Sequence, residues 1–136
     1  RVHSCADEPP AELIAGIAQF NTGEFYECHE TLEAIWLAEP GDIRRLYQGI
    51  LQVGVAFYHL RRGNYRGATS LLQTGITYLR AFGPECMGID VERLVDESIA
   101  AYSELSRLGP NRKAEFDQRL VPVITWKKPP GSTPGA

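Results

Sequence analysis

Hydrophobic residues recur at spacings of three and four along most of the chain, which is the pattern of amphipathic helices that bury one face. Glycine and proline interrupt this pattern at intervals, and both residues disfavour the interior of a helix. The interruptions lie at Gly23, Pro40-Gly41, Gly63-Asn64, Gly83-Pro84 and Gly109-Pro110. The pattern therefore predicts an all-α fold, a bundle of about five helices.

The interruptions set the expected limits of each helix. The five predicted helices run from Pro9 to about Asn21, from Phe25 to before Pro40, from about Asp42 to Arg62, from Tyr65 to before Phe82, and from Val91 to before Gly109. Asp90 should cap the last helix, because its carboxylate can accept hydrogen bonds from free backbone N–H groups. A further turn or two is predicted within residues 114–120. The third helix is apolar around most of its circumference, which predicts that it lies in the middle of the bundle.

Two segments 40 residues apart correspond to each other. Gly23 corresponds to Gly63, and Phe25 corresponds to Tyr65. This correspondence predicts two equivalent helix-turn-helix hairpins, followed by a C-terminal helix. Residues 1–126 are expected to form a single domain, and the proline- and glycine-rich residues 127–136 a flexible C-terminal tail.

Composition and charge narrow the class of protein. The chain of 136 residues has a formal net charge of -3, so no global positive field favours nucleic acid or a membrane surface as a partner. The three cysteines form no Cys-x-x-Cys pair and are expected to be reduced thiols of a cytoplasmic protein. The chain begins at Arg1 instead of methionine, so a removed leader remains an open alternative.

The second and third predicted helices carry polar residues on faces that should be buried. On the second helix, His29 lies on the apolar face and Glu33 lies one turn further along. On the third, Gln48, Gln52 and His59 share one strip. Because buried polar groups need partners, we expect these side chains to meet across a shared seam.

Two interpretations of this cluster remain open. It could be a structural hydrogen-bond network that sets the register of two helices. Alternatively, His29, Glu33 and His59, with Gln52, could be catalytic groups or ligands of a divalent transition metal such as zinc, iron or manganese. The spacing His-Glu-x-x-Glu is not the His-Glu-x-x-His of zinc proteases. His3 is expected to lie in a frayed terminus, with no role.

An anion site is a further hypothesis. Arg61, Arg62 and Arg66 surround the turn at Gly63-Asn64. Three arginines at one helix junction could bind a phosphate or another anion, although such groups are commonly solvated.

A longer signature resembles a known family, the domain of unknown function 309. It comprises Phe20-Asn21-x-Gly23-x-Phe25-x-Glu27-x-His29-Glu30-x-Leu32-Glu33-x-x-Trp36, then Tyr47-Gln48-Gly49-Ile50-x-Gln52, then Tyr58-His59 and Gly63-Asn64-x-x-Gly67-Ala68. The resemblance is strong from Ala11 to Leu79 and looser beyond, with Tyr26 and Cys28 as minor departures. It implies a small all-helical protein of bacteria and archaea, and it implies no activity.

From these features we expect a helical-hairpin binding or scaffolding domain, acting as a homo-oligomer or with a protein partner. The reason is that the hairpins are clear while no complete catalytic motif is present. The alternative is a metal-dependent hydrolase or lyase that uses His29, Glu33 and His59. Whether the chain is an enzyme stays open at this point.

Overall fold

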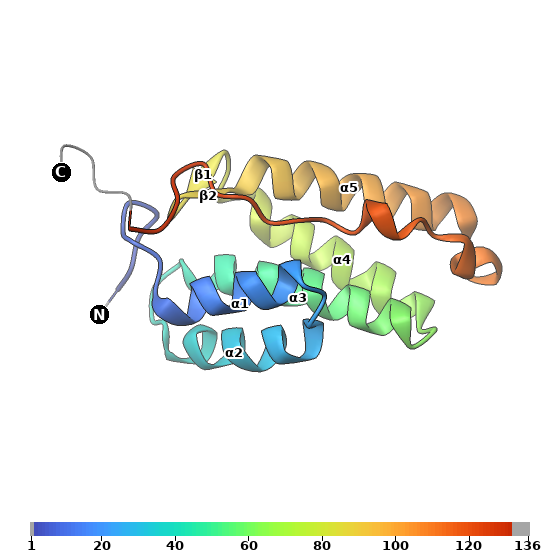
Figure 1. The fold of residues 1–136 in the computed structure, drawn as a ribbon, viewed down its shortest axis with the longest axis horizontal. Coiled ribbons are helices and arrows are strands. Elements are labelled where there is room, and N and C mark those ends of the chain that lie inside the picture. Colours follow the sequence, from blue (N-terminus) through green and yellow to red (C-terminus); the bar gives the residue numbers. More distant parts are fainter. Residues whose placement is uncertain (1, 132–136) are drawn as a thin grey trace.

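Helices make up most of the computed structural model, which describes residues 2–131 (Figure 1). The described elements are α1 (Ala11–Asn21), α2 (Phe25–Ala38), α3 (Arg44–Arg61), α4 (Tyr65–Arg80), β1 (Glu85–Cys86), β2 (Ile89–Asp90), α5 (Val91–Leu108), and the 3-10 helices η1 (Pro110–Glu115) and η2 (Gln118–Leu120). The predicted all-α class is confirmed, and each of the five predicted helices is present. The side chain of Asp90 caps α5 by accepting a hydrogen bond from the backbone N–H of Arg93 at 3.0 Å, as predicted.

The turns of the two helical hairpins have the same backbone geometry. Gly23 ends the α1–α2 turn with φ of 79°, and Gly63 ends the α3–α4 turn with φ of 77°. Glu24 N–H donates to Gln19 O at 2.8 Å in the first turn, and Asn64 N–H donates to His59 O at 2.9 Å in the second. Glycine adopts such positive φ values without steric cost. The predicted correspondence of the two hairpins is confirmed.

The central helix is α3, as its apolar circumference predicts. Ten of its residues are buried, and it packs between α2 and α4. Gly49 and Gly75 let the backbones of α3 and α4 approach closely, because a Cβ atom on Gly75 would lie 3.0 Å from the carbonyl oxygen of Gly49. Real Cβ atoms are rarely found so close to backbone oxygen, so the crossing of these two helices depends on both glycines.

The C-terminal segment returns along the bundle in a way that the sequence pattern did not predict. Beyond η2 it runs back beside α5 toward the end of the molecule where the N-terminus lies (Figure 1). The Asn21 side chain fixes it by two hydrogen bonds, from Nδ2 to Ile124 O at 2.9 Å and from Ile124 N to Oδ1 at 2.8 Å. Trp126 then forms a bridge with Ile89 of β2.

The tail predicted to be flexible begins on the hairpin formed by β1 and β2. The backbone N–H groups of Lys127 and Lys128 donate to Gly88 O at 2.8 and 3.1 Å. Residues 132–136 of the predicted tail lie outside the described residues. The division into one domain of residues 1–126 and a tail stays a prediction.

The expectation of three reduced cysteines is wrong for two of them. Cys5 and Cys86 form a disulfide across a sequence separation of 81 residues, with a Cα–Cα distance of 4.4 Å. Cys28 is a free thiol buried in the core, and burial raises its pKa to about 12. The sequence gives no spacing that pairs Cys5 with Cys86, because only the packing of the N-terminal segment on the β-hairpin brings them together.

Candidate functional site

The predicted pair on α2 forms, but at the surface. His29 Nε2 lies 3.3 Å from Glu33 Oε2, and the two side chains are 36% and 44% exposed. A pair with this exposure exchanges its partners readily with water. The face of α2 that carries His29 and Glu33 is therefore more exposed to solvent than the sequence pattern predicts.

The polar strip on α3 separates into three different environments. Gln48 is buried and accepts a hydrogen bond from Arg45. Gln52 has a buried side-chain oxygen that no described residue satisfies. His59 Nδ1 lies 3.4 Å from Asn64 Nδ2, in the α3–α4 turn. The strip is therefore not one continuous hydrogen-bond network.

The register of α2 and α3 offsets His29 from His59, and the two histidines have different partners. The two helices are antiparallel, and the Tyr26 and Tyr58 rings lie 5.9 Å apart where α2 begins and α3 ends. His59 follows Tyr58 directly, while His29 lies nearly a full turn further along α2. Within residues 2–131, no three His, Cys, Asp or Glu side chains are grouped so that they could hold a metal ion. His29, Glu33 and His59 are therefore not grouped as a three-ligand metal site in the described part of the chain.

The three arginines proposed for an anion site point in different directions. Arg61 donates from Nη1 to Gly23 O at 2.6 Å and lies over the Phe25 ring. Arg62 lies over the Tyr58 ring at 5.6 Å from its centroid. Arg66 is exposed on the first turn of α4. Arg61 lines a cleft, which it shares with Lys113, a residue that the sequence pattern did not indicate.

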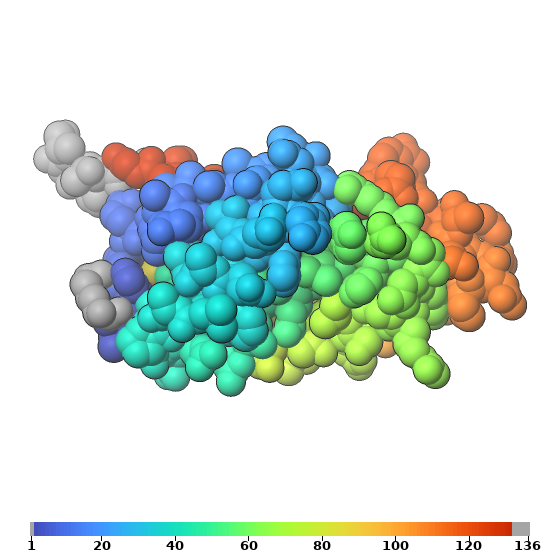
Figure 2. Space-filling view, turned by 90° about the horizontal axis from the view of Figure 1, so that it is seen from below, coloured from blue at the N-terminus to red at the C-terminus, as the bar shows by residue number. Residues whose placement is uncertain are grey.

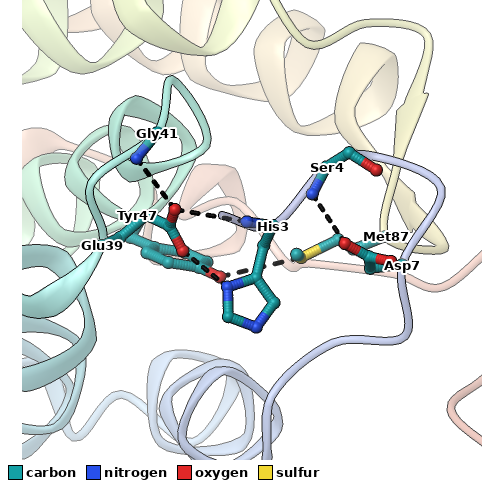
Figure 3. A network of polar contacts seen from close by, with 7 residues as sticks. All are labelled: His3, Ser4, Asp7, Glu39, Gly41, Tyr47 and Met87. Carbon is teal, nitrogen blue, oxygen red and sulfur yellow. Dashed lines mark hydrogen bonds and ion pairs between the residues drawn. The ribbon is translucent and has the colours of Figure 1, made fainter. Parts of the chain in front are cut away.

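A second histidine–glutamate pair was missed altogether (Figure 3). His3 Nδ1 lies 2.6 Å from Glu39 Oε1, and the backbone N–H groups of His3 and Gly41 donate to Glu39 Oε2 at 3.3 and 2.9 Å. Glu39 is only 6% exposed. The expectation of a frayed terminus at His3 is therefore wrong, because a buried carboxylate on another element holds this histidine.

The pKa values of Glu39 and of the neighbouring Tyr47 are both shifted from their ordinary values. Burial alone would raise the pKa of Glu39, but the hydrogen bonds from Gly41 and His3 outweigh it, so the pKa lies below its ordinary value. Tyr47 lies beside this pair with its hydroxyl toward Met87 Sδ (Figure 3). Burial, with the charge of Glu39 second, raises the pKa of Tyr47 to about 12.

One signal in the sequence could have found this pair. Residues 2–43 contain no lysine or arginine, so His3 and His29 are the only side chains in that stretch that could offer a buried carboxylate a positive charge. The pair helps to hold the N-terminal segment, together with the Cys5–Cys86 disulfide and a hydrogen bond from Met87 N to Cys5 O at 2.8 Å.

Charge is divided between residues 2–43, which contain the α1–α2 hairpin, and residues 44–84, which contain the α3–α4 hairpin. Residues 2–43 carry nine acidic residues: Asp7, Glu8, Glu12, Glu24, Glu27, Glu30, Glu33, Glu39 and Asp42. Residues 44–84 carry six arginines and no acidic residue: Arg44, Arg45, Arg61, Arg62, Arg66 and Arg80. The described arginine–carboxylate ion pairs all lie beyond residue 84. Within residues 2–131 the opposite charges of the two hairpins are therefore not neutralised by ion pairs between them.

Comparison with known proteins places this fold among relatives. Residues 13–71 match the family described as domain of unknown function (DUF309). The chain is 35% identical to a Bacillus subtilis (strain 168) protein named uncharacterized protein YpuF, over 88% of this chain and 78% of that protein. It is 32% identical over 69 residues to an uncharacterized protein of Aquifex aeolicus (strain VF5), and this match covers 48% of this chain and 20% of that protein. The family match contains both hairpin turns but neither His3 nor Lys113.

Proposed function

Because the chain belongs to the domain of unknown function 309 family, whose description carries no activity, we propose its function from its surface: it is a helical-hairpin binding module that scaffolds assembly. The observation that carries this proposal is the division of charge between the α1–α2 and α3–α4 hairpins. Complementary charge that is not used inside a chain is available to steer and align a partner. The partner we propose is a second copy of this chain.

The acidic half of the docking face is the outer side of α2. Glu27 and Glu30 are exposed there, and two large apolar side chains project beside them, Tyr26 at 53% exposure and Leu37 at 66%. Apolar residues next to charges of one sign are a common composition of docking surfaces. In a complex, the apolar side chains of this face can become buried, and its carboxylates can orient the partner.

The basic half adjoins it at the α3–α4 turn. Arg62 lies over Tyr58, whose ring contacts Tyr26 of α2, and Arg66 is exposed on the first turn of α4. The surfaces of α2 and of this turn lie side by side in Figure 2, where the turn is green. Tyrosine and arginine are the side chains most enriched at interface hot spots.

An acidic half beside a basic half is self-complementary about a two-fold axis. In such a dimer the α2 carboxylates of one copy face the arginines of the other, and the reverse contact follows by symmetry. The closed arrangement satisfies both halves at once, which an open chain of copies would not do at its ends.

Charge reversal provides the test. Sedimentation velocity of the wild type should show a dimer that weakens as salt is raised, because exposed charges are screened. The Glu27→Arg/Glu30→Arg variant and the Arg62→Glu/Arg66→Glu variant should each weaken dimerisation at least about tenfold. An equimolar mixture of the two variants should recover dimer, since each then carries the charge that the other lost.

The matched control reverses two exposed charges elsewhere, Glu92→Arg/Asp96→Arg on α5. It should dimerise like the wild type, and circular dichroism should show that all variants keep their helices. A wild type that stays monomeric at low salt, or variants that fail to pair when mixed, would contradict the proposal.

A metal-dependent hydrolase or lyase remains the alternative, supported only by the His29–Glu33 pair at 3.3 Å. Elemental analysis of untagged protein tests it, together with thermal shifts on adding zinc, manganese or iron. Bound metal in stoichiometric amount, lost in the His29→Ala variant, would favour it over the binding module.

The expectation of a cytoplasmic location was based on reduced cysteines. The Cys5–Cys86 disulfide removes that basis, because disulfides are typical of oxidising compartments.

A further inference from the structure

A cleft of about 330 Å³ opens at the turn end of the two hairpins. Its walls include the apolar side chains Phe25, Phe57 and Val121, and two cationic side chains, Arg61 and Lys113. The cleft lies between the α3–α4 turn and the segment that contains η1 and η2. These two parts are distant in the sequence and meet only in the tertiary structure. Its volume is at the lower end of the range found for small-molecule sites.

Arg61 is held in this cleft by the geometry of the first hairpin turn. Its Nη1 donates to Gly23 O at 2.6 Å, and its guanidinium lies 4.7 Å from the centroid of the Phe25 ring. A Cβ atom on Gly23 would lie 2.6 Å from Nη2, so glycine leaves the room that the guanidinium occupies. A guanidinium has five N–H donors, and Gly23 O accepts from one of its nitrogens. The remaining donors are pre-oriented without side-chain motion.

Lys113 reaches the cleft from η1. Its Nζ donates to Pro110 O at 3.2 Å, and its Cε lies 3.7 Å from the position of a Cβ atom on Gly63. The carboxylates that follow it in sequence are taken by other arginines, Glu115 by Arg112 and Asp117 by Arg119, each at 2.9 Å.

Arg61 and Lys113 therefore make no ion pair with any of residues 2–131, yet both line one cleft with an apolar wall. Charge next to an apolar wall is less screened than charge in open water. The pair is consequently suited to an anion, with the guanidinium as a planar, two-pronged donor and the ammonium as a point charge.

We propose that this cleft is a binding site for an oxyanion, a carboxylate or a phosphate monoester, that carries an apolar group. The oxyanion contacts Arg61 and Lys113, and the apolar group packs on the wall formed by Leu60 and Val121. The site adjoins the docking face at the α3–α4 turn but uses none of that face's charged side chains, and it replaces the three-arginine site expected from the sequence.

Four probes separate the possible sources of this chemistry: inorganic phosphate, phenyl phosphate, phenylacetate and neutral benzyl alcohol. Their binding is followed by amide chemical shifts of Gly23, Gly63 and Val121 in NMR titrations. Phenyl phosphate or phenylacetate should bind more tightly than inorganic phosphate, because only they contact the apolar wall. Benzyl alcohol should not bind detectably.

Substitutions then assign the contacts. Lys113→Gln should weaken binding of the tightest probe about tenfold, the usual range for one charge-assisted hydrogen bond. Arg61→Gln should weaken it at least as much. The matched control is Arg80→Gln, because this exposed arginine at the end of α4 belongs neither to the cleft nor to the docking face. No shifted amide with any anionic probe, or equal weakening by Arg80→Gln and Lys113→Gln, would overturn the proposal.

Discussion

Two histidine–glutamate pairs of similar chemistry occupy contrasting places in this molecule. His29 and Glu33 lie four residues apart on α2, 3.3 Å from each other and both more than a third exposed. His3 and Glu39 lie 36 residues apart, with a contact of 2.6 Å and with the Glu39 side chain only 3% exposed. The first pair joins two turns of one helix, while the second joins the N-terminal segment to the end of α2.

The difference shows that a short sequence separation between two paired residues does not imply a large contribution to stability. A pair four residues apart on a helix is easy to recognise, but in water it contributes little. A buried carboxylate that loses its partners keeps its desolvation cost, so the pair with no local signature should matter more for stability. Four experiments test this contrast.

The largest effect is expected from the disulfide that holds the segment containing His3. Reduction of Cys5–Cys86 should lower the free energy of unfolding by about 3 kcal/mol, because the bond closes a long loop in the unfolded chain. Urea denaturation with and without dithiothreitol measures the change. A Cys5→Ser/Cys86→Ser variant is the control, since it should not respond to the reductant. An unchanged wild type would show that the segment is held by other contacts.

Removal of the buried carboxylate comes next. Glu39→Ala should cost about 2 kcal/mol of unfolding free energy, because it leaves the His3 and Gly41 N–H groups without their acceptor. Glu33→Ala, on α2 shortly before Glu39, is the matched control and should cost much less. Thermal and urea denaturation of the two variants compare them directly. Equal losses would remove the distinction between the two pairs.

A smaller, pH-dependent effect follows from the lowered pKa of Glu39. A carboxylate whose pKa is lowered by folding stabilises the folded state above its ordinary pKa of 4.5, and this contribution is lost as the pH falls through the folded value. The stability advantage of the wild type over Glu39→Gln should therefore shrink below pH 4.5. Arginine hydrogen bonds also lower the pKa of Glu104, Glu115 and Asp117, so only this difference isolates Glu39. A difference that grows on acidification would contradict the assignment.

The smallest effect is expected at the surface pair. His29→Ala should change the unfolding free energy by less than about 0.5 kcal/mol, in keeping with exposed pairs one turn apart. Thermal denaturation at low and high salt measures it. A loss as large as that of Glu39→Ala would show that His29 is part of a buried network after all.

Local sequence patterns predicted the helices well because their causes are local. The positive φ of Gly23 and Gly63 depends on the residue at the turn itself, so the two hairpins could be recognised from a 40-residue offset. The central position of α3 follows from its apolar circumference. The cap at Asp90 follows from a side chain three residues from its donor.

The spatial arrangement of the candidate residues could not be predicted in the same way, because it depends on helix register and on distant segments. His29 and His59 were each placed on the correct helix, yet the antiparallel register of α2 and α3 sets them nearly a turn apart. Arg61 was identified from the turn, but its cleft partner Lys113 lies on η1, about fifty residues further along the chain. A helical wheel contains neither kind of information.

Hydrophobic periodicity and turn residues determined the number, limits and order of the helices, since each depends on interactions within a few residues. Tertiary structure alone decided that Cys5 meets Cys86, that Glu39 is buried against His3, and that Arg61 shares a cleft with Lys113. These contacts join residues 36 to 81 positions apart. Their formation depends on how the packed helices place the terminal segments, and many different sequences with the same helical pattern would place them elsewhere.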